Sequence, residues 1–173
     1  LGRLGGFDAA IALYERVLAA APDQPRVWMS YGHMLKTVGR QADGVDAYRR
    51  AIAAEPTLGE AWWSLANLKT VRFTDADLTA MAAARAGTDL VEDDALHLDF
   101  ALGKAYEDRG DADIAFAHYA AGNAMRRAQL GYDPQLLTDM VDAMIAVATP
   151  DFFAARAGWG CQAPDAIFIL GMP

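Results

Sequence analysis

The side chains best suited to metal binding or acid–base chemistry are three histidines, and they are scattered along the chain. His33, His97 and His118 are far apart in the sequence, and none belongs to a ligand spacing such as HExxH. A helical zinc site needs two histidines one turn apart, on the same face of the helix. The sequence therefore favours structural or solvent-facing roles for these histidines over metal ligation.

Two acidic groups have simpler explanations than a metal site. Residues 92–94 read Glu-Asp-Asp and precede a predicted helix, where negative charge is favourable near the positive end of the helix dipole. Asp108, Asp111 and Asp113 resemble a calcium loop only loosely, because their spacing differs and the bidentate glutamate is missing. We predict no metal site from either group.

The remaining reactive or nucleotide-like features are also weak. Cys161 is the only cysteine, so an internal disulfide and a cysteine-rich metal site are both excluded. It stands in a Gly-rich stretch without a histidine neighbour that would support nucleophilic use. The glycines of residues 2–6 follow no predicted strand and carry no nucleotide signal. We predict no catalytic residue, no cofactor-binding residue and no metal in this chain.

Composition narrows the classes of partner. The 173 residues carry 15 Lys and Arg against 23 Asp and Glu, a formal net charge of −8. An acidic surface argues against nucleic acid or an anionic membrane as the main partner. No run approaches the roughly 20 apolar residues that span a bilayer. The single cysteine and the lack of a signal pattern at the N-terminus fit the cytoplasm, which is the location we expect.

The stretch from residue 25 to residue 58 is the unit that the rest of the chain repeats. It predicts two short helices with a turn near Gly39, because its apolar residues recur every three and four positions. Residues of the same type recur 34 positions apart along the first part of the chain. The pairs are Gly5 and Gly39, Tyr14 and Tyr48, Pro22 and Pro56, and Trp28 and Trp62.

Small and large residues alternate within this unit in a way that suits closely packed helices. Gly32 and Ala51 stand among bulky residues such as Trp28 and Tyr48. Small residues let two helices approach, and bulky ones fill the space beside the contact. Trp28 and Trp62 are interpreted as packing anchors, because both repeat with the period of the fold.

A period of about 34 residues with this pattern of Trp, Gly, Ala, Tyr and Pro resembles the tetratricopeptide repeat (TPR). The resemblance implies an all-α fold, a right-handed superhelix of antiparallel helix pairs. We expect about three and a half repeats within residues 1–129, and the third carries a three-residue insertion and a helix capped by Thr74. Their ranges are 1–24, 25–58, 59–95 and 96–129.

The residues after the array are expected to differ in character. Pro134 fits the first turn of a helix that caps the array, within a segment of residues 130–156 that also includes an extra turn. Residues 157–165 contain glycines and a proline and predict a linker. The apolar run of residues 166–170 predicts a short buried strand, a C-terminal stub that opens residues 166–173.

The end of the chain has a more specific resemblance. TPDFFAARAGWG at 149–160, followed by AIFILGMP at 166–173, resembles the junction in bacterial TPR-containing sulfotransferases, as do residues 60–70 and 96–111. The resemblance implies a parent enzyme that uses 3′-phosphoadenosine-5′-phosphosulfate. Gly171 and Pro173 would border its donor loop, which does not follow here. Because the sequence also begins at Leu1, we expect a non-catalytic piece of a longer protein.

The TPR resemblance further implies a concave groove lined by the first helix of each repeat. Repeat register places Met29, Trp63 and Phe100 at one equivalent position, and apolar residues beside polar and basic ones suit an extended peptide. A solvated face with incidental aromatic residues is the alternative. The peptide-groove candidates are Arg26, Met29, His33, Lys36, Trp63, Asn67, Phe100 and Lys104, with Glu60 and His97 on the same face.

These observations lead to one expected function and one alternative. We expect a protein-interaction or substrate-presenting region of a sulfotransferase, whose partner is a peptide, another protein or its own catalytic domain. The alternative is a free-standing TPR adaptor that binds a peptide in its groove. The first helix lacks its repeat partner, so its apolar face is a possible site of homo-oligomer formation.

Overall fold

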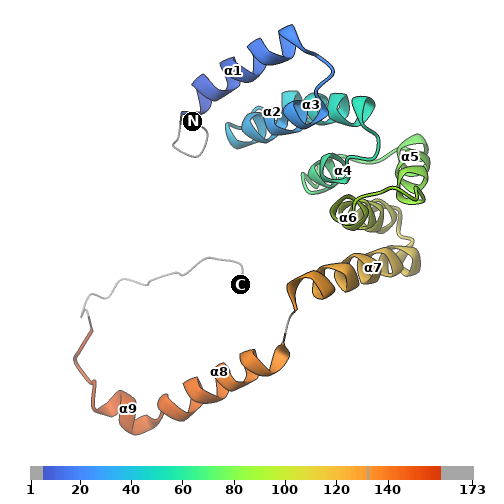
Figure 1. The fold of residues 1–173 in the computed structure, drawn as a ribbon. Helices are drawn as coiled ribbons and strands as arrows, with labels where there is room; N and C mark the ends of the chain where they lie inside the picture. Colours follow the sequence, from blue (N-terminus) through green and yellow to red (C-terminus); the bar gives the residue numbers. More distant parts are fainter. Residues whose placement is uncertain (1–5, 132, 161–173) are drawn as a thin grey trace. The chain divides into compact units, whose positions relative to one another are not determined.

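A computed structural model describes residues 6–131 and 133–160 (Figure 1). Helix is the dominant regular structure, and no strand occurs within these ranges. The expectation of an all-α fold is therefore confirmed, whereas the strand predicted over 166–170 lies outside the described residues. The chain divides into two units, Leu1–Leu130 and Gly131–Pro173.

The first unit is built of helical hairpins, as Figure 1 shows. In order, its helices are α1 (Phe7–Ala20), α2 (Pro25–Thr37), α3 (Gln41–Ala54), α4 (Gly59–Ala66), α5 (Asp75–Arg85), α6 (Glu92–Arg109) and α7 (Ala112–Leu130). The closest packing joins α2 to α3, α6 to α7, and α4 to α6.

The turns of the two regular hairpins share one glycine geometry. Gly39 follows α2 with φ 83°, and Gly110 follows α6 with φ 84°. This left-handed conformation favours glycine and lets the next amide reach back to the helix. The Arg40 amide donates to the Leu35 carbonyl at 2.9 Å, and the Asp111 amide donates to Tyr106 at 3.0 Å. The turn predicted near Gly39 is therefore confirmed, and the same geometry recurs at Gly110.

The two repeated tryptophans have matching surroundings. The indole N–H of Trp62 donates to the carbonyl of Pro56 at 2.9 Å, and that of Trp28 donates to the carbonyl of Pro22 at 2.7 Å. Trp62 is only 2% exposed, and Trp28 packs half-buried against the same core. The interpretation of both residues as packing anchors is confirmed.

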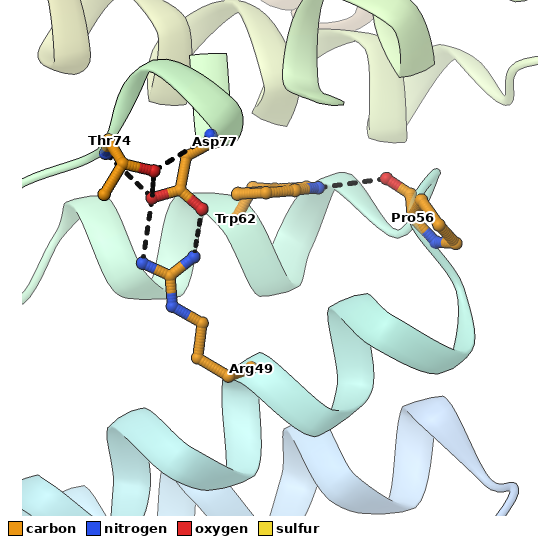
Figure 2. Close-up of polar contacts among 5 residues, drawn as sticks. All are labelled: Arg49, Pro56, Trp62, Thr74 and Asp77. Carbon is orange, nitrogen blue, oxygen red and sulfur yellow. Dashed lines mark hydrogen bonds and ion pairs between the residues drawn. The ribbon is translucent and has the colours of Figure 1, made fainter. Parts of the chain in front are cut away.

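The third repeat departs from the pattern in its second helix. Thr74 caps α5, as predicted from the sequence, and the structure adds that Thr74 and Asp77 form a capping box. The Asp77 carboxylate also accepts hydrogen bonds from the guanidinium of Arg49 on α3 (Figure 2). Arg49 Nη2 lies 3.1 Å from Asp77 Oδ2. α4 packs against α6, where a Cβ on Gly59 would lie 2.2 Å from the Asp94 carbonyl oxygen. The ion pair thus ties α5 to α3, and both α4 and α5 pack against α6.

The second unit contains α8 (Pro134–Val147) and α9 (Pro150–Ala154). Asp133 caps α8 by accepting a hydrogen bond from the Gln135 amide at 2.9 Å, and Pro134 occupies the first turn. None of the residues of α8 and α9 is buried. The helix itself is confirmed, and its role as a cap of the array stays a prediction. No helix among the described residues is long and apolar enough to cross a membrane.

Candidate partner-binding surface

Side chains from the first helices of successive repeats meet across α2, α4 and α6. His33 Nε2 of α2 lies 3.7 Å from Glu60 Oε1 of α4. Further along, the ring of Trp63 on α4 lies 5.5 Å from that of Phe100 on α6. These contacts join the three helices in one surface, which we call the first-helix face. Its residues are Arg26, His33, Lys36, Glu60, Trp63, Asn67, Phe100 and Lys104.

Aromatic rings form the centre of the first-helix face. Trp63 and Phe100 meet at an interplanar angle of 46°, and Phe100 also lies 6.3 Å from the ring of Tyr119 on α7. A Cβ on Gly122 would lie 3.3 Å from Phe100, so the ring rests directly on the α7 backbone. Tilted rings at these distances attract one another beyond the effect of their buried area. Trp63 and Phe100 nevertheless stay partly exposed, which leaves apolar surface for a partner.

His33 links the first-helix face to the core. Its Nδ1 lies 2.9 Å from the hydroxyl of Tyr48, which is completely buried. Burial lowers the pKa of His33, although the Glu60 carboxylate opposes this effect. Burial also raises the pKa of the Tyr48 phenol to about 12. The arrangement favours a neutral imidazole that holds a buried hydroxyl, which is a structural use of the histidine.

A charge cluster borders the aromatic centre. Lys104, one turn beyond Phe100, contacts the carboxylate of Asp108, and Arg72 contacts the same oxygen. Burial by itself would raise the pKa of Asp108, but these two cations hold it below its usual value. Sequence reasoning missed Arg72, because it lies in the α4–α5 connection and outside the repeat pattern. The guanidinium remains accessible, with 69% of the side chain exposed.

All but one of the other predicted groove residues discussed next lie at the surface. Arg26, Lys36 and Asn67 are exposed, and Arg26 also lines a pocket of about 460 Å³ with residues 87–91. Met29 is the exception, since it is 7% exposed and belongs to the core cluster with Trp62. The expectation that Met29 presents a surface to a ligand is therefore corrected: its thioether fills the interior.

A buried carboxylate that sequence reasoning did not single out joins three helices. Asp99 of α6 is 2% exposed and accepts hydrogen bonds from Arg85 Nε at 2.9 Å and His118 Nδ1 at 3.0 Å. The His118 ring also stacks on Tyr106, with the planes 5° apart. Both carboxylate oxygens are thus engaged, which makes Asp99 a structural tie between α5, α6 and α7. The sequence feature that could have identified Asp99 is a charged residue within the apolar pattern of a helix.

Metal binding has no support in the arrangement of side chains. Among residues 6–131 and 133–160, no group of three or more His, Cys, Asp or Glu side chains could hold a metal ion. The acidic residues 92–94 form the first turn of α6. Asp94 has a further role there, since its Oδ1 accepts a hydrogen bond from the Gly59 amide at 2.9 Å.

The fold and the first-helix face define an all-α array of TPR-type helix pairs. No family model matches the chain, and no curated protein matches it. Among solved structures, it is similar to the crystal structure of MamA, with 20% sequence identity over 75% of this chain and 94% of that chain. The TM-score is 0.39.

Proposed function

We propose that this chain is a protein-interaction array and that a peptide or protein partner binds on the first-helix face. The contact between Trp63 and Phe100 carries this proposal. Two adjacent helices present large aromatic side chains there, and each ring is only partly covered. Burying such rings under a partner removes apolar surface from water, and aromatic residues are common centres of binding energy.

The groups around the aromatic pair suit recognition better than catalysis. His33 and Glu60 lie on one side, and Lys104 lies one turn beyond Phe100 on the other. A polar rim around an apolar centre is the usual anatomy of an interaction surface. We propose that these polar groups orient the partner while Trp63 and Phe100 supply most of the affinity.

Selection of peptides from a displayed library on the full chain tests this proposal. Affinities of the selected peptides are then measured by fluorescence anisotropy for wild type, Trp63→Ala and Phe100→Ala. We expect binding at least about tenfold weaker in both variants, since a central aromatic residue commonly contributes 1.4 kcal/mol or more. Phe116→Ala is the matched control, because Phe116 is an aromatic side chain of α7 that is 73% exposed.

Folding is checked by thermal melting, and Lys104→Ala provides a variant on the rim of the face. Peptides that bind the Trp63 and Phe100 variants as tightly as wild type would refute the proposal. So would peptides whose binding depends on Phe116 instead.

We further propose that the chain is part of a longer sulfotransferase, with 3′-phosphoadenosine-5′-phosphosulfate as donor and a cytoplasmic location. Support for the enzyme comes from the sequence resemblance of residues 60–70, 96–111, 149–160 and 166–173, and support for the location comes from the single cysteine. The array would then dock on the catalytic domain or gather acceptors near it.

The residues encoded after Pro173 test the proposed sulfotransferase role. Arg-Ser-Gly-Thr-Thr followed by an α/β domain supports the enzyme. A stop codon there instead supports the adaptor. Calorimetry of the longer protein with 3′-phosphoadenosine-5′-phosphate supplies the biochemical test.

A further inference from the structure

A histidine connects three helices of the array through both of its ring nitrogens. His33 of α2 places Nδ1 at 2.9 Å from the hydroxyl of Tyr48 on α3, and Nε2 at 3.7 Å from Oε1 of Glu60 on α4. The rings of His33 and Tyr48 also meet edge to face, with their centroids 5.4 Å apart. Histidine is the side chain whose charge ordinarily changes between about pH 5 and pH 8. The junction of α2, α3 and α4 therefore contains a group that mild acid can titrate.

The two neighbours of the imidazole favour one neutral tautomer. An ionised carboxylate can only accept hydrogen bonds, so the nitrogen that faces Glu60 is the one that carries the proton. Nδ1 then keeps its lone pair, and the Tyr48 hydroxyl can donate to it. The opposite tautomer would turn the lone pair of Nε2 toward a negative charge. A neutral His33 with its proton on Nε2 thus suits both neighbours at once.

A second proton on the imidazole disturbs this arrangement. Nδ1 would then face the Tyr48 hydroxyl as a donor, and the phenol would have to turn its own proton away. The Tyr48 ring has no space in which to shift, because it is completely buried and a Cβ on Gly32 would lie 2.6 Å from its Cε1. Only 36% of the His33 side chain is exposed, so water solvates the added charge incompletely. Protonation therefore works against the packing of α2 on α3.

The groups that face the imidazole act in opposite directions. Burial has the largest effect and holds the pKa of His33 below its ordinary value of 6.5. Glu60 on α4 raises this pKa, whereas Lys36 on α2 lowers it. On α3 the Tyr48 phenol stays uncharged, because burial raises its pKa to about 12. As the pH falls through about 6.5, the unfolded chain binds the His33 proton before the folded chain does, and the folded state loses stability.

We propose that His33 is a pH-sensitive latch between the second and third repeats, closed by the neutral imidazole and weakened when acid protonates it. In the closed state, His33 accepts the hydroxyl proton of Tyr48 and directs its own N–H toward Glu60. In the protonated state, the bond to the buried phenol is disturbed and α2 is held less firmly against α3. The latch rests on contacts inside the array and does not depend on the partner proposed for the first-helix face.

Nitrogen chemical shifts of the full chain, labelled with ¹⁵N-histidine, test the closed state directly. At about pH 7.5 we expect the proton of His33 on Nε2 and none on Nδ1, with a titration midpoint below 6.5. Glu60→Gln removes the group that favours protonation and should lower the midpoint further. Lys36→Gln removes the group that opposes protonation and should raise it. Loss of signals in His33→Gln assigns the resonances.

Urea unfolding at about pH 7.5 and about pH 5 measures the effect on the fold. From the higher to the lower pH, we expect the folding equilibrium constant of wild type to fall at least about threefold more than that of His33→Gln. Glutamine keeps an acceptor for the Tyr48 hydroxyl but cannot be protonated. His118→Gln is the matched control, because His118 is also a partly buried histidine, with 27% of its side chain exposed. It leaves His33 and its neighbours intact and should retain the loss in acid.

Several results would overturn the proposal. A proton on Nδ1 of neutral His33, or a midpoint at or above 6.5, would show that the ring is not held as described. Equal falls in the folding constants of wild type and His33→Gln, or a loss in acid that only His118→Gln abolishes, would place the pH sensitivity elsewhere. The titration of wild type decides the matter by itself if His33→Gln does not fold.

Discussion

The ring of Tyr48 occupies the space in which a side chain at position 32 would begin. A Cβ built on Gly32 would lie 2.6 Å from Tyr48 Cε1, and the same relationship recurs between Gly103 and Tyr119 at 2.7 Å. In both regular hairpins, a tyrosine of the second helix thus packs directly on a glycine of the first. Glycine is required at these positions because the tyrosine ring already fills the space that a Cβ would take.

Gly32→Ala should destabilise the fold by about 1–3 kcal/mol through overpacking. Helix propensity alone predicts the opposite sign, a gain of about 1 kcal/mol. Overpacking should prevail, because the Tyr48 side chain is completely buried and has no free space to move into. Urea unfolding measures the difference. In a Tyr48→Ala background the same substitution should become neutral or stabilising, and persistence of its cost there would contradict the explanation.

Trp62→Ala should cost about 3–5 kcal/mol, the range for a fully buried large side chain. Trp28→Ala should cost less, because Trp28 is only partly buried and one face of its ring lies under the Arg50 guanidinium at 4.8 Å. Free energies from urea unfolding of the two variants give the comparison. Equal costs would mean that the matching hydrogen bonds, and not burial, set their contributions.

Asp77→Ala should destabilise the fold by about 2–4 kcal/mol, because it removes a capping box and leaves Arg49 without its bidentate partner. Asp75→Ala is the matched control two residues earlier. Asp75 pairs with Arg109, but its side chain is 93% exposed, so the expected loss is below about 1 kcal/mol. Thermal melts of both variants test the difference, and similar melting temperatures would count against the inter-repeat tie.

Stability should fall as the pH drops below about 4, the ordinary pKa range of aspartate. Burial tends to raise the pKa of Asp77, but hydrogen bonds from Arg49 and Thr74 outweigh it and hold the pKa below its usual value. As the pH falls, Asp77 is therefore protonated in the unfolded chain before it is protonated in the folded one. The stability that Asp77 contributes is complete above about pH 4, and it is lost as the pH falls through the lower pKa of the folded state. Unfolding free energies between pH 2 and pH 7 should decline less steeply for Asp77→Ala than for wild type.

Much of the array could be predicted from the sequence, because its determinants are local. Gly39 and Gly110 end helices through a backbone conformation that favours glycine, and Thr74 caps α5 through a contact three residues away. The 34-residue offset of Trp28 and Trp62 likewise anticipated their shared hydrogen-bond geometry. Repeat register also brought Trp63 and Phe100 to equivalent positions, and the structure places them in contact.

Only the tertiary structure decided how the irregular third repeat is joined to its neighbours. Arg49 of α3 meets Asp77 of α5, and Asp94 of α6 meets Gly59 of α4, and the repeat pattern predicts neither contact. The burial of Met29 and the pairing of Arg72 with Asp108 likewise arise from packing between segments that are distant in the sequence. A periodic sequence specifies what each helix offers to its neighbour, whereas the packing of a helix that breaks the period depends on which surfaces are left for it to bury.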